Sequence, residues 1–143
     1  MPDFTYLSSN ISLESNKVRD FLRTAENFFA VLDRNKIFSE VQIRAAMEHV
    51  DRNRGKKVRD DATLLMLYLS GHSQIPKAYG AVGVTPGTRN FLIIHDSRND
   101  LGRFLDAFKS LKENKSLSLP VDCPDKDTIV FGNMAKVELE LTL

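Results

Sequence analysis

The sequence lacks most of the features that mark secreted, membrane-spanning and strongly nucleic-acid-binding proteins. Cys123 is the single cysteine in 143 residues, which excludes an internal disulfide and a cysteine-based zinc site. The longest uninterrupted apolar run, Leu64–Leu69, is far shorter than the ~18 residues that a membrane span needs. The 20 Lys and Arg residues almost balance the 19 Asp and Glu residues, so a contact with nucleic acid has to come from a local patch. These absences predict a cytoplasmic protein.

The usual signatures of catalysis and of bound cofactors are also missing. The glycines of Gly80–Gly83 fit neither the dinucleotide-binding nor the P-loop pattern, and no strand directly precedes them. The histidines are too scattered for a metal signature. Cys123 follows Asp122, whose negative charge disfavours the thiolate that a nucleophile needs. We therefore expect no catalytic residue, no metal and no cofactor. The alternative is a small α/β enzyme of unrecognised type that uses His72 or Cys123.

The hydrophobic pattern predicts a few short strands between helices. Phe28–Leu32 and Phe91–Ile94 are wholly apolar runs, which is typical of buried strands. Apolar and polar residues alternate over Lys136–Leu143, which predicts a closing strand with one solvated face. The apolar stripe from Leu101 to Leu111 predicts a helix with its polar start at Ser97 or Asn99.

The clearest helix start lies at Ser39. Ser39 and Gln42 match a capping box, in which the Ser39 hydroxyl accepts from the Gln42 amide and the Gln42 side chain reaches back. Three adjacent helices are predicted between Ser39 and Val82, and this argues against a regular doubly wound array. We expect one domain over residues 1–143, of mixed α/β class. Its short mixed sheet has helices packed mainly on one side and a helical cluster in the middle of the chain.

The most informative segment of the chain is a polar corner between two apolar stretches. Leu64–Leu69 predicts a buried helix, and the apolar spacing over Ile75–Val82 predicts a short amphipathic one. Ser73 is expected to cap the second helix, and Gly83 to take the left-handed conformation beyond its end. The corner between them exposes polar side chains and is predicted to be a recognition surface.

Two groups of residues are candidates for RNA contact. At the corner they are Ser70, His72, Gln74 and Lys77, and in the basic run that begins at Arg52 they are Lys56, Lys57 and Arg59. An imidazole, an amide and an ammonium suit unpaired bases and phosphates, and Tyr68 or Tyr79 would add stacking if exposed. The alternative is structural, with corner side chains that cap helices and basic side chains that form a solvated loop.

The corner also resembles a motif of the small regulatory subunit of the KEOPS complex, the PRPK-binding protein family. The matching residues are Leu67, Ser70, Gly71, Gln74, Ile75, Ala78 and Gly83. The order of elements is similar from about Phe28 to Ile94, and the segment Ala135–Leu143 is loosely similar.

This resemblance implies a non-catalytic subunit of a tRNA-modifying complex. KEOPS makes threonylcarbamoyl-adenosine next to the anticodon of tRNAs that read codons starting with adenine. In this family the small subunit docks on the small atypical kinase subunit and stimulates it. It also helps to recruit tRNA through the single-stranded 3′ CCA end. A plain protein-interaction module that does not bind RNA is a further alternative.

Overall fold

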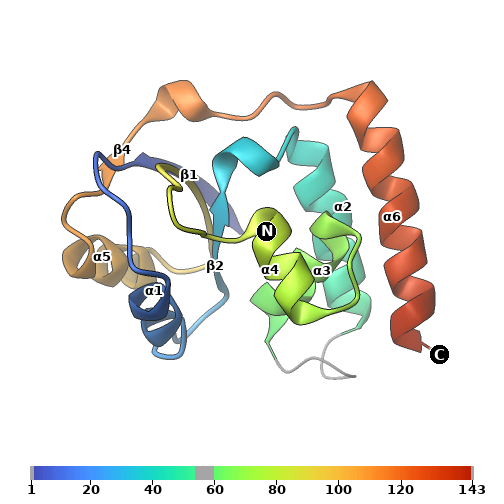
Figure 1. The fold of residues 1–143 in the computed structure, drawn as a ribbon, viewed down its shortest axis with the longest axis horizontal. Helices are drawn as coiled ribbons and strands as arrows, with labels where there is room; N and C mark the ends of the chain where they lie inside the picture. The colour runs from blue at the N-terminus through green and yellow to red at the C-terminus, as the bar shows by residue number, and fades with distance from the viewer. Residues whose placement is uncertain (1, 54–59, 143) are drawn as a thin grey trace. The chain divides into compact units, whose positions relative to one another are not determined.

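The computed structural model describes residues 2–53 and 60–142, and its backbone contacts divide the chain into two compact units (Figure 1). The first unit combines Met1–Asn35 with Val84–Ser118, and the second combines Lys36–Gly83 with Leu119–Leu143. Each unit is therefore built from two separate segments of the chain. The sequence had predicted a single domain over the same residues.

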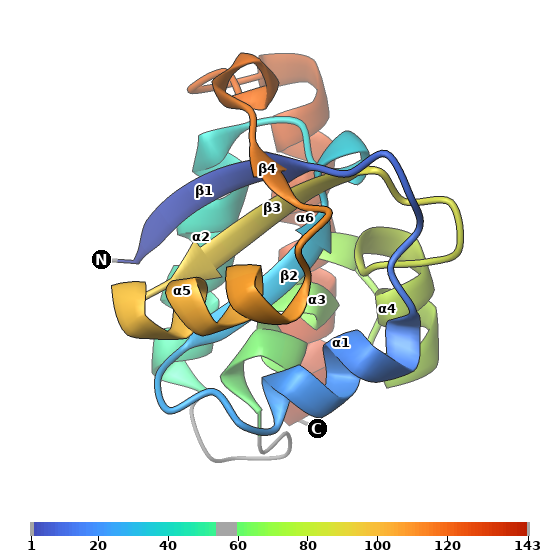
Figure 2. The ribbon, with the colours of Figure 1, turned by 90° about the vertical axis from the view of Figure 1, so that its left-hand side faces the viewer.

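The first unit is built on a four-stranded sheet in the order β2-β3-β1-β4 (Figure 2). The strands are β1 Asp3–Ser8, β2 Phe29–Asp33, β3 Asn90–His95 and β4 Lys112–Glu113. The two buried strands predicted from apolar runs are confirmed as β2 and β3. The mixed α/β class is also confirmed, but the expected mixed pairing is wrong, because all pairings between the described strands are antiparallel.

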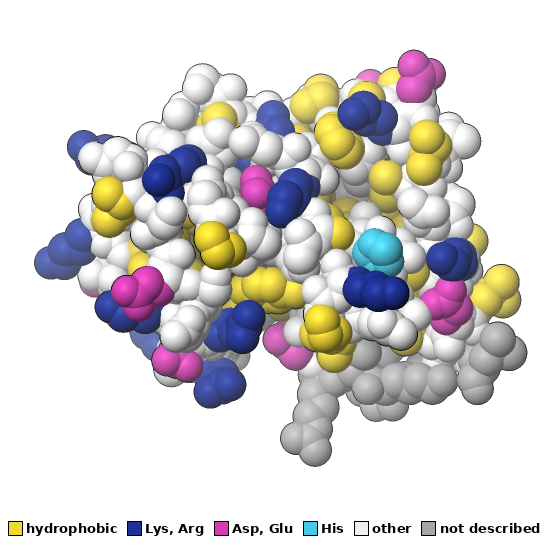
Figure 3. Space-filling model, in the orientation of Figure 1, with side chains coloured by type: hydrophobic (Ala, Val, Ile, Leu, Met, Phe, Trp, Pro, Cys, Tyr) yellow, Lys and Arg dark blue, Asp and Glu magenta, His cyan; other side chains and the backbone are white. Residues whose placement is uncertain are grey.

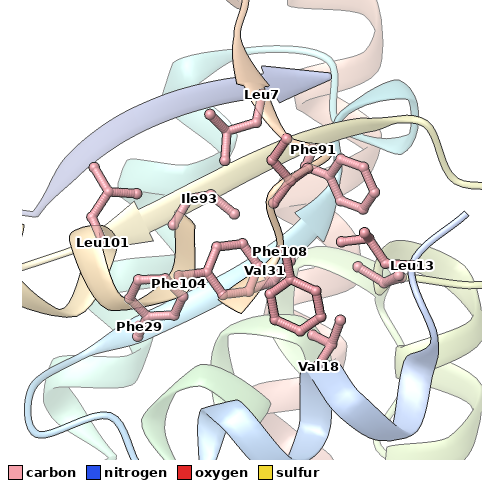
Figure 4. Packing of buried hydrophobic residues seen from close by; sticks show 12 residues of the cluster. Leu7, Leu13, Val18, Phe29, Val31, Phe91, Ile93, Leu101, Phe104 and Phe108 are labelled. Atoms are coloured by element: carbon pink, nitrogen blue, oxygen red, sulfur yellow. The ribbon is translucent and has the colours of Figure 1, made fainter. Parts of the chain in front are cut away.

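Helices α1, Ser15–Leu22, and α5, Arg98–Ala107, belong to the same unit and contribute to one apolar core (Figure 4). Strand residues two apart point to the same face, so Phe91 and Ile93 both face this core. Phe104 belongs to the same core, and its ring centroid lies 5.3 Å from that of Phe29. The Ser97 hydroxyl caps α5 by accepting from the N–H groups of the first turn, which confirms the predicted start.

The second unit is helical. It contains α2 Glu40–Arg52, α3 Asp61–Ser70, α4 Ile75–Val82 and α6 Pro124–Thr142. Two short 3-10 turns, η1 Arg34–Lys36 and η2 Lys115–Leu117, complete the described elements. The predicted cluster of three helices in the middle of the chain is confirmed as α2, α3 and α4. In the described part of the chain, no helix has both the length and the apolar character needed to cross a membrane.

The predicted closing strand over residues 136–143 is wrong, because this segment is the second half of α6. Helical spacing explains the difference. Val130, Met134 and Val137 follow each other at intervals of four and three residues, and Met134 and Val137 are buried on one face of the helix. The predicted strand would have placed Leu139 on its apolar face, but this side chain is 64% exposed.

The starts of α2 and α6 are joined through one buried carboxylate. Ser39 caps α2 as predicted, accepting from the Gln42 N–H at 3.4 Å. The other half of the capping box is wrong, because the Gln42 amide donates to Asp127 Oδ1 at 2.8 Å instead of reaching back. Asp127 also accepts from the Ser39 hydroxyl at 2.6 Å and from the Cys123 N–H at 2.7 Å. The Gln42 amide thus has a tertiary partner in place of the local one.

Candidate nucleic-acid interface

The polar corner begins where α3 ends at Gly71. This glycine takes the left-handed conformation, with φ 75°, and its N–H donates to the Leu67 carbonyl at 3.0 Å. The Ser70 hydroxyl donates to the same carbonyl at 3.2 Å and accepts from the His72 N–H at 3.1 Å. The side chain of Ser70 is therefore engaged within the turn, as in the structural alternative.

Gly71 also brings the corner against α6. A Cβ atom at this position would lie 2.8 Å from the Cβ atom of Asn133, which is closer than real Cβ contacts allow. Glycine is thus required here for two reasons, the positive φ and the missing side chain. Segments more than 60 residues apart in the sequence meet at this point.

Helix α4 starts and ends differently from the prediction. Its N-cap residue is Gln74 instead of Ser73, and the Gln74 side chain makes no capping bond. Gly83 is not left-handed, since its φ is −83°. A Cβ atom at Gly83 would lie 2.6 Å from the Tyr79 carbonyl oxygen. Glycine is therefore needed here because the backbone at this helix end leaves no room for a side chain.

The corner and α6 together line an open hollow of about 140 Å³, which we call the corner hollow. Its lining residues are Gly71, His72, Ser73, Gln74, Lys77, Lys136 and Glu140. His72, Gln74 and Lys77 were predicted from the sequence and are brought together here. Ser70 was predicted but does not line the hollow, while Lys136 and Glu140 were missed. Figure 3 shows one face of the molecule, with an exposed histidine beside a Lys or Arg side chain.

The charge of the corner hollow is weakly positive. Lys77 forms no ion pair with another described residue, whereas Lys136 Nζ lies 3.8 Å from Glu140 Oε1. The two residues of this exposed pair are one helical turn apart on α6, and water weakens the attraction between their charges. Ammonium groups can meet phosphates, and the exposed imidazole and amide can meet base faces and edges. The arrangement suits a short single-stranded end rather than a duplex.

Lys136 and Glu140 were missed because residues 136–143 were interpreted as a strand. A strand would have placed these two side chains on the same face as well, but with no reason to lie near the corner. The signal that was available is the helical spacing of Val130, Met134 and Val137. With that helix assigned, Lys136 and Glu140 fall together on a face next to the buried one.

A polar cluster on the buried side of α6 holds this helix against α2 and α3. Tyr68 is fully buried, stacks on His49 with ring centroids 4.6 Å apart, and donates its hydroxyl proton to Glu138. Asn53 donates to the same carboxylate at 2.8 Å. Tyr68 therefore cannot stack on a base, contrary to one possibility raised by the sequence.

The titration of this cluster follows from its hydrogen bonds. Burial raises the pKa of Tyr68, and the neighbouring carboxylate adds to this effect. Burial also acts to raise the pKa of Glu138. The hydrogen bonds from Tyr68 and Asn53, together with the nearby His49, outweigh burial and hold the pKa of Glu138 below its ordinary value. The carboxylate is thus ionised at neutral pH and fixes the half of α6 that carries Lys136.

The loop candidates Lys56, Lys57 and Arg59 lie outside the described residues. Arg52, at the start of the same basic run, has a structural role: its guanidinium lies 3.0 Å from His49 Nδ1 and 3.9 Å from Glu138 Oε1. The structure therefore shows where the corner candidates lie, and RNA contact by either group remains a prediction.

Within residues 2–53 and 60–142, no group of three His, Cys, Asp or Glu side chains is placed to hold a metal ion. Cys123 is half-buried just before α6, where its N–H serves Asp127. Of the mostly buried histidines, His49 faces Glu138 and His95 faces Thr5. No family model matches the chain, and no curated protein matches it.

The geometry at Gly71 leads to a stability prediction. Gly71→Ala is expected to lower the free energy of unfolding by about 2–4 kcal/mol, because it combines backbone strain with overpacking against Asn133. The matched control is Gly80→Ala, inside α4, where nothing lies within 4 Å of the added atom. That change should stabilise by roughly 0.5–1 kcal/mol, as alanine does in a helix. Urea unfolding measures both, and equal effects of the two changes would contradict the role given to Gly71.

Proposed function

We propose that this protein is a non-catalytic, cytoplasmic subunit of the KEOPS complex. In this role it binds and stimulates the small atypical kinase subunit and helps to recruit tRNA for threonylcarbamoyl-adenosine formation. The observation that carries the proposal is the corner hollow. His72, Gln74 and Lys77, picked out from the sequence, lie around one hollow together with Lys136 from a distant segment.

The chemistry of the corner hollow favours the single-stranded 3′ end of tRNA as the bound part. Unpaired bases can be splayed and recognised by stacking and by base-edge hydrogen bonds, which a duplex does not offer. His72 and Gln74 are both exposed and supply these two interactions. Lys77 and Lys136 supply phosphate contacts without preference for sequence.

A lasting protein partner is supported by exposed apolar side chains on and just before α6. Val121, Ile129 and Leu139 are 67%, 65% and 64% exposed, and each offers apolar surface that a protein partner could cover. Figure 3 shows apolar side chains gathered near the end where α6 begins. The same observation favours the second candidate function, a protein-interaction module that never binds RNA.

The dependence of tRNA binding on the 3′ tail tests the role of the corner hollow. The unmodified protein should bind intact tRNA more tightly than tRNA without its single-stranded tail. His72→Ala with Gln74→Ala should narrow that difference, because stacking and edge contacts are worth roughly 1–3 kcal/mol per base. Glu48→Ala, an exposed change on α2 outside the hollow, is the control and should leave the difference intact.

A pull-down with the kinase subunit, with and without tRNA, separates the candidate functions. Capture of the kinase together with tail-dependent tRNA binding supports the proposal. Capture of the kinase without any tRNA binding supports the plain interaction module. ATP hydrolysis by the purified protein alone, if abolished by His72→Ala, would establish the enzyme alternative and refute a non-catalytic subunit.

A further inference from the structure

Another hollow lies in the sheet-containing unit, where β1 meets the start of α5. This α5 cavity has a volume of about 230 Å³. Its polar lining consists of Asp3, Thr5, His95, Arg98 and Glu113, and its apolar lining of Phe4, Leu7, Leu101 and Leu105. The function proposed above uses none of these residues, so the cavity needs an explanation of its own.

Strand pairing explains why a cavity forms at this place. Asp3 and His95 are direct partners across β1 and β3, and both point to the face that carries α5. On the other side of β1, the pairing with β4 extends over Leu7 and Ser8 alone. Strand β4 therefore does not extend over the half of β1 that carries Asp3 and Thr5. Leu7 and Leu101, both labelled in Figure 4, contribute to the apolar lining of the cavity.

The polar part of the cavity is built around a buried histidine. His95 is 1% exposed, and its Nε2 lies 2.8 Å from the Thr5 hydroxyl. The other ring nitrogen, Nδ1, is buried and forms no hydrogen bond of normal geometry within the described residues, although the Ser97 backbone lies beside the ring. Burial lowers the pKa of His95, so the imidazole is neutral at pH 7 and adds no charge to the cavity.

Charges of both signs surround the cavity and are not paired with each other. Asp3, Arg98 and Glu113 are exposed, and none of them forms an ion pair with another described residue. A simple anion would meet Arg98 but also two carboxylates, and a simple cation would meet the carboxylates but also Arg98. An uncharged apolar molecule would make no contact that uses the three charged groups. A small zwitterion satisfies both signs together.

We propose that the α5 cavity binds a free α-amino acid with an aliphatic side chain. The guanidinium of Arg98 receives the carboxylate, which it can hold with two parallel hydrogen bonds. The carboxylates of Asp3 and Glu113 receive the ammonium group, and Leu101 and Leu105 contact the aliphatic side chain. The volume lies below the ~300 Å³ at which pockets for drug-sized ligands begin, which matches a molecule of this size.

Ligand titration on the full chain, followed by amide ¹H–¹⁵N NMR, tests the proposal without any substitution. Leucine is the probe, and its relatives each lack one recognised group: 4-methylpentanoate lacks the ammonium, 3-methylbutylamine lacks the carboxylate, and glycine lacks the side chain. Leucine should shift the amide signals of Asp3, His95 and Arg98. Each relative should bind about tenfold more weakly, because each loses a charged or apolar contact.

Substitutions at the cavity provide the second arm. Arg98→Gln should weaken leucine binding about tenfold without weakening 3-methylbutylamine, since that amine has no carboxylate and loses only a like-charge repulsion. Asp3→Asn with Glu113→Gln should weaken leucine and 3-methylbutylamine without weakening 4-methylpentanoate, which has no ammonium group and loses only like-charge repulsion. Asp106→Asn and Lys109→Gln, exposed and outside the cavity, are the matched controls. Equal affinities for leucine and its relatives, or leucine binding untouched by Arg98→Gln, would overturn the assignment.

Discussion

Replacing Asp127 by alanine is expected to lower the free energy of unfolding by about 3–5 kcal/mol at pH 7, because buried donors lose their charged acceptor. The carboxylate is 4% exposed and accepts from Ser39, Gln42 and the Cys123 N–H at 2.6, 2.8 and 2.7 Å. Without it, these groups remain buried and the starts of α2 and α6 lose their link. Urea unfolding at fixed pH measures the loss.

Asp125→Ala is the matched control for this substitution. Asp125 also lies in the first turn of α6, but its side chain is exposed. Its removal should cost less than about 1 kcal/mol, the size of an exposed interaction with a helix dipole. Similar losses for the two aspartates would show that charge at the helix start, and not the buried link, stabilises α6.

The pH dependence of stability gives an independent check on Asp127. Burial acts to raise its pKa, but the hydrogen bonds from Ser39, Cys123 and Gln42 outweigh burial and lower the pKa below its ordinary value. A lowered pKa in the folded state means that the stabilisation is present above the unfolded pKa, ~3.9, and is lost as pH falls through the folded one. The stability difference between the unmodified protein and Asp127→Asn should therefore shrink below about pH 4. A constant difference would contradict the lowered pKa.

Reversing both lysines of the corner hollow should weaken tRNA binding about 100-fold at low salt, roughly tenfold for each change. Lys77→Glu and Lys136→Glu each remove an attraction to phosphate and add a repulsion at the same place. The plot of affinity against salt concentration should also become flatter, because fewer counterions are released. Filter binding or fluorescence anisotropy over a salt series measures both effects.

Lys109→Glu with Lys112→Glu is the matched control, since it makes the same change in net charge with exposed lysines outside the hollow. An equal loss in the control would show that net charge, not the corner hollow, governs affinity. Binding unchanged by reversal of Lys77 and Lys136 would remove the corner from the tRNA path and leave Lys56, Lys57 and Arg59 as the remaining candidates.

Several features of this protein were determined by short stretches of sequence. The buried helix over Leu64–Leu69, the apolar strands β2 and β3, and the caps at Ser39 and Ser97 were all predictable. Each depends on the burial or hydrogen bonding of residues within a few positions of one another. The polar corner was identified for the same reason, because a break between two apolar helices is a local pattern.

Strand β1 could not be predicted from a local sequence pattern. Asp3–Ser8 mixes polar and apolar residues, and within it only Tyr6 and Leu7 are buried. Its place beside β3 depends on pairing with residues about 90 positions away. Propensity for such a strand is decided by its neighbours in the sheet more than by its own composition.

The composition of the candidate site itself was decided by tertiary structure. The sequence determined that His72, Gln74 and Lys77 share one exposed corner, since they lie within six residues of one another. The helix α6 and the close contact of Gly71 with Asn133 decided that Lys136 and Glu140 complete the hollow. Tyr68 is likewise buried by tertiary packing, with its hydroxyl bonded to Glu138. Packing against a second helix is a non-local effect, so it cannot be predicted from the spacing or the charge of a single segment.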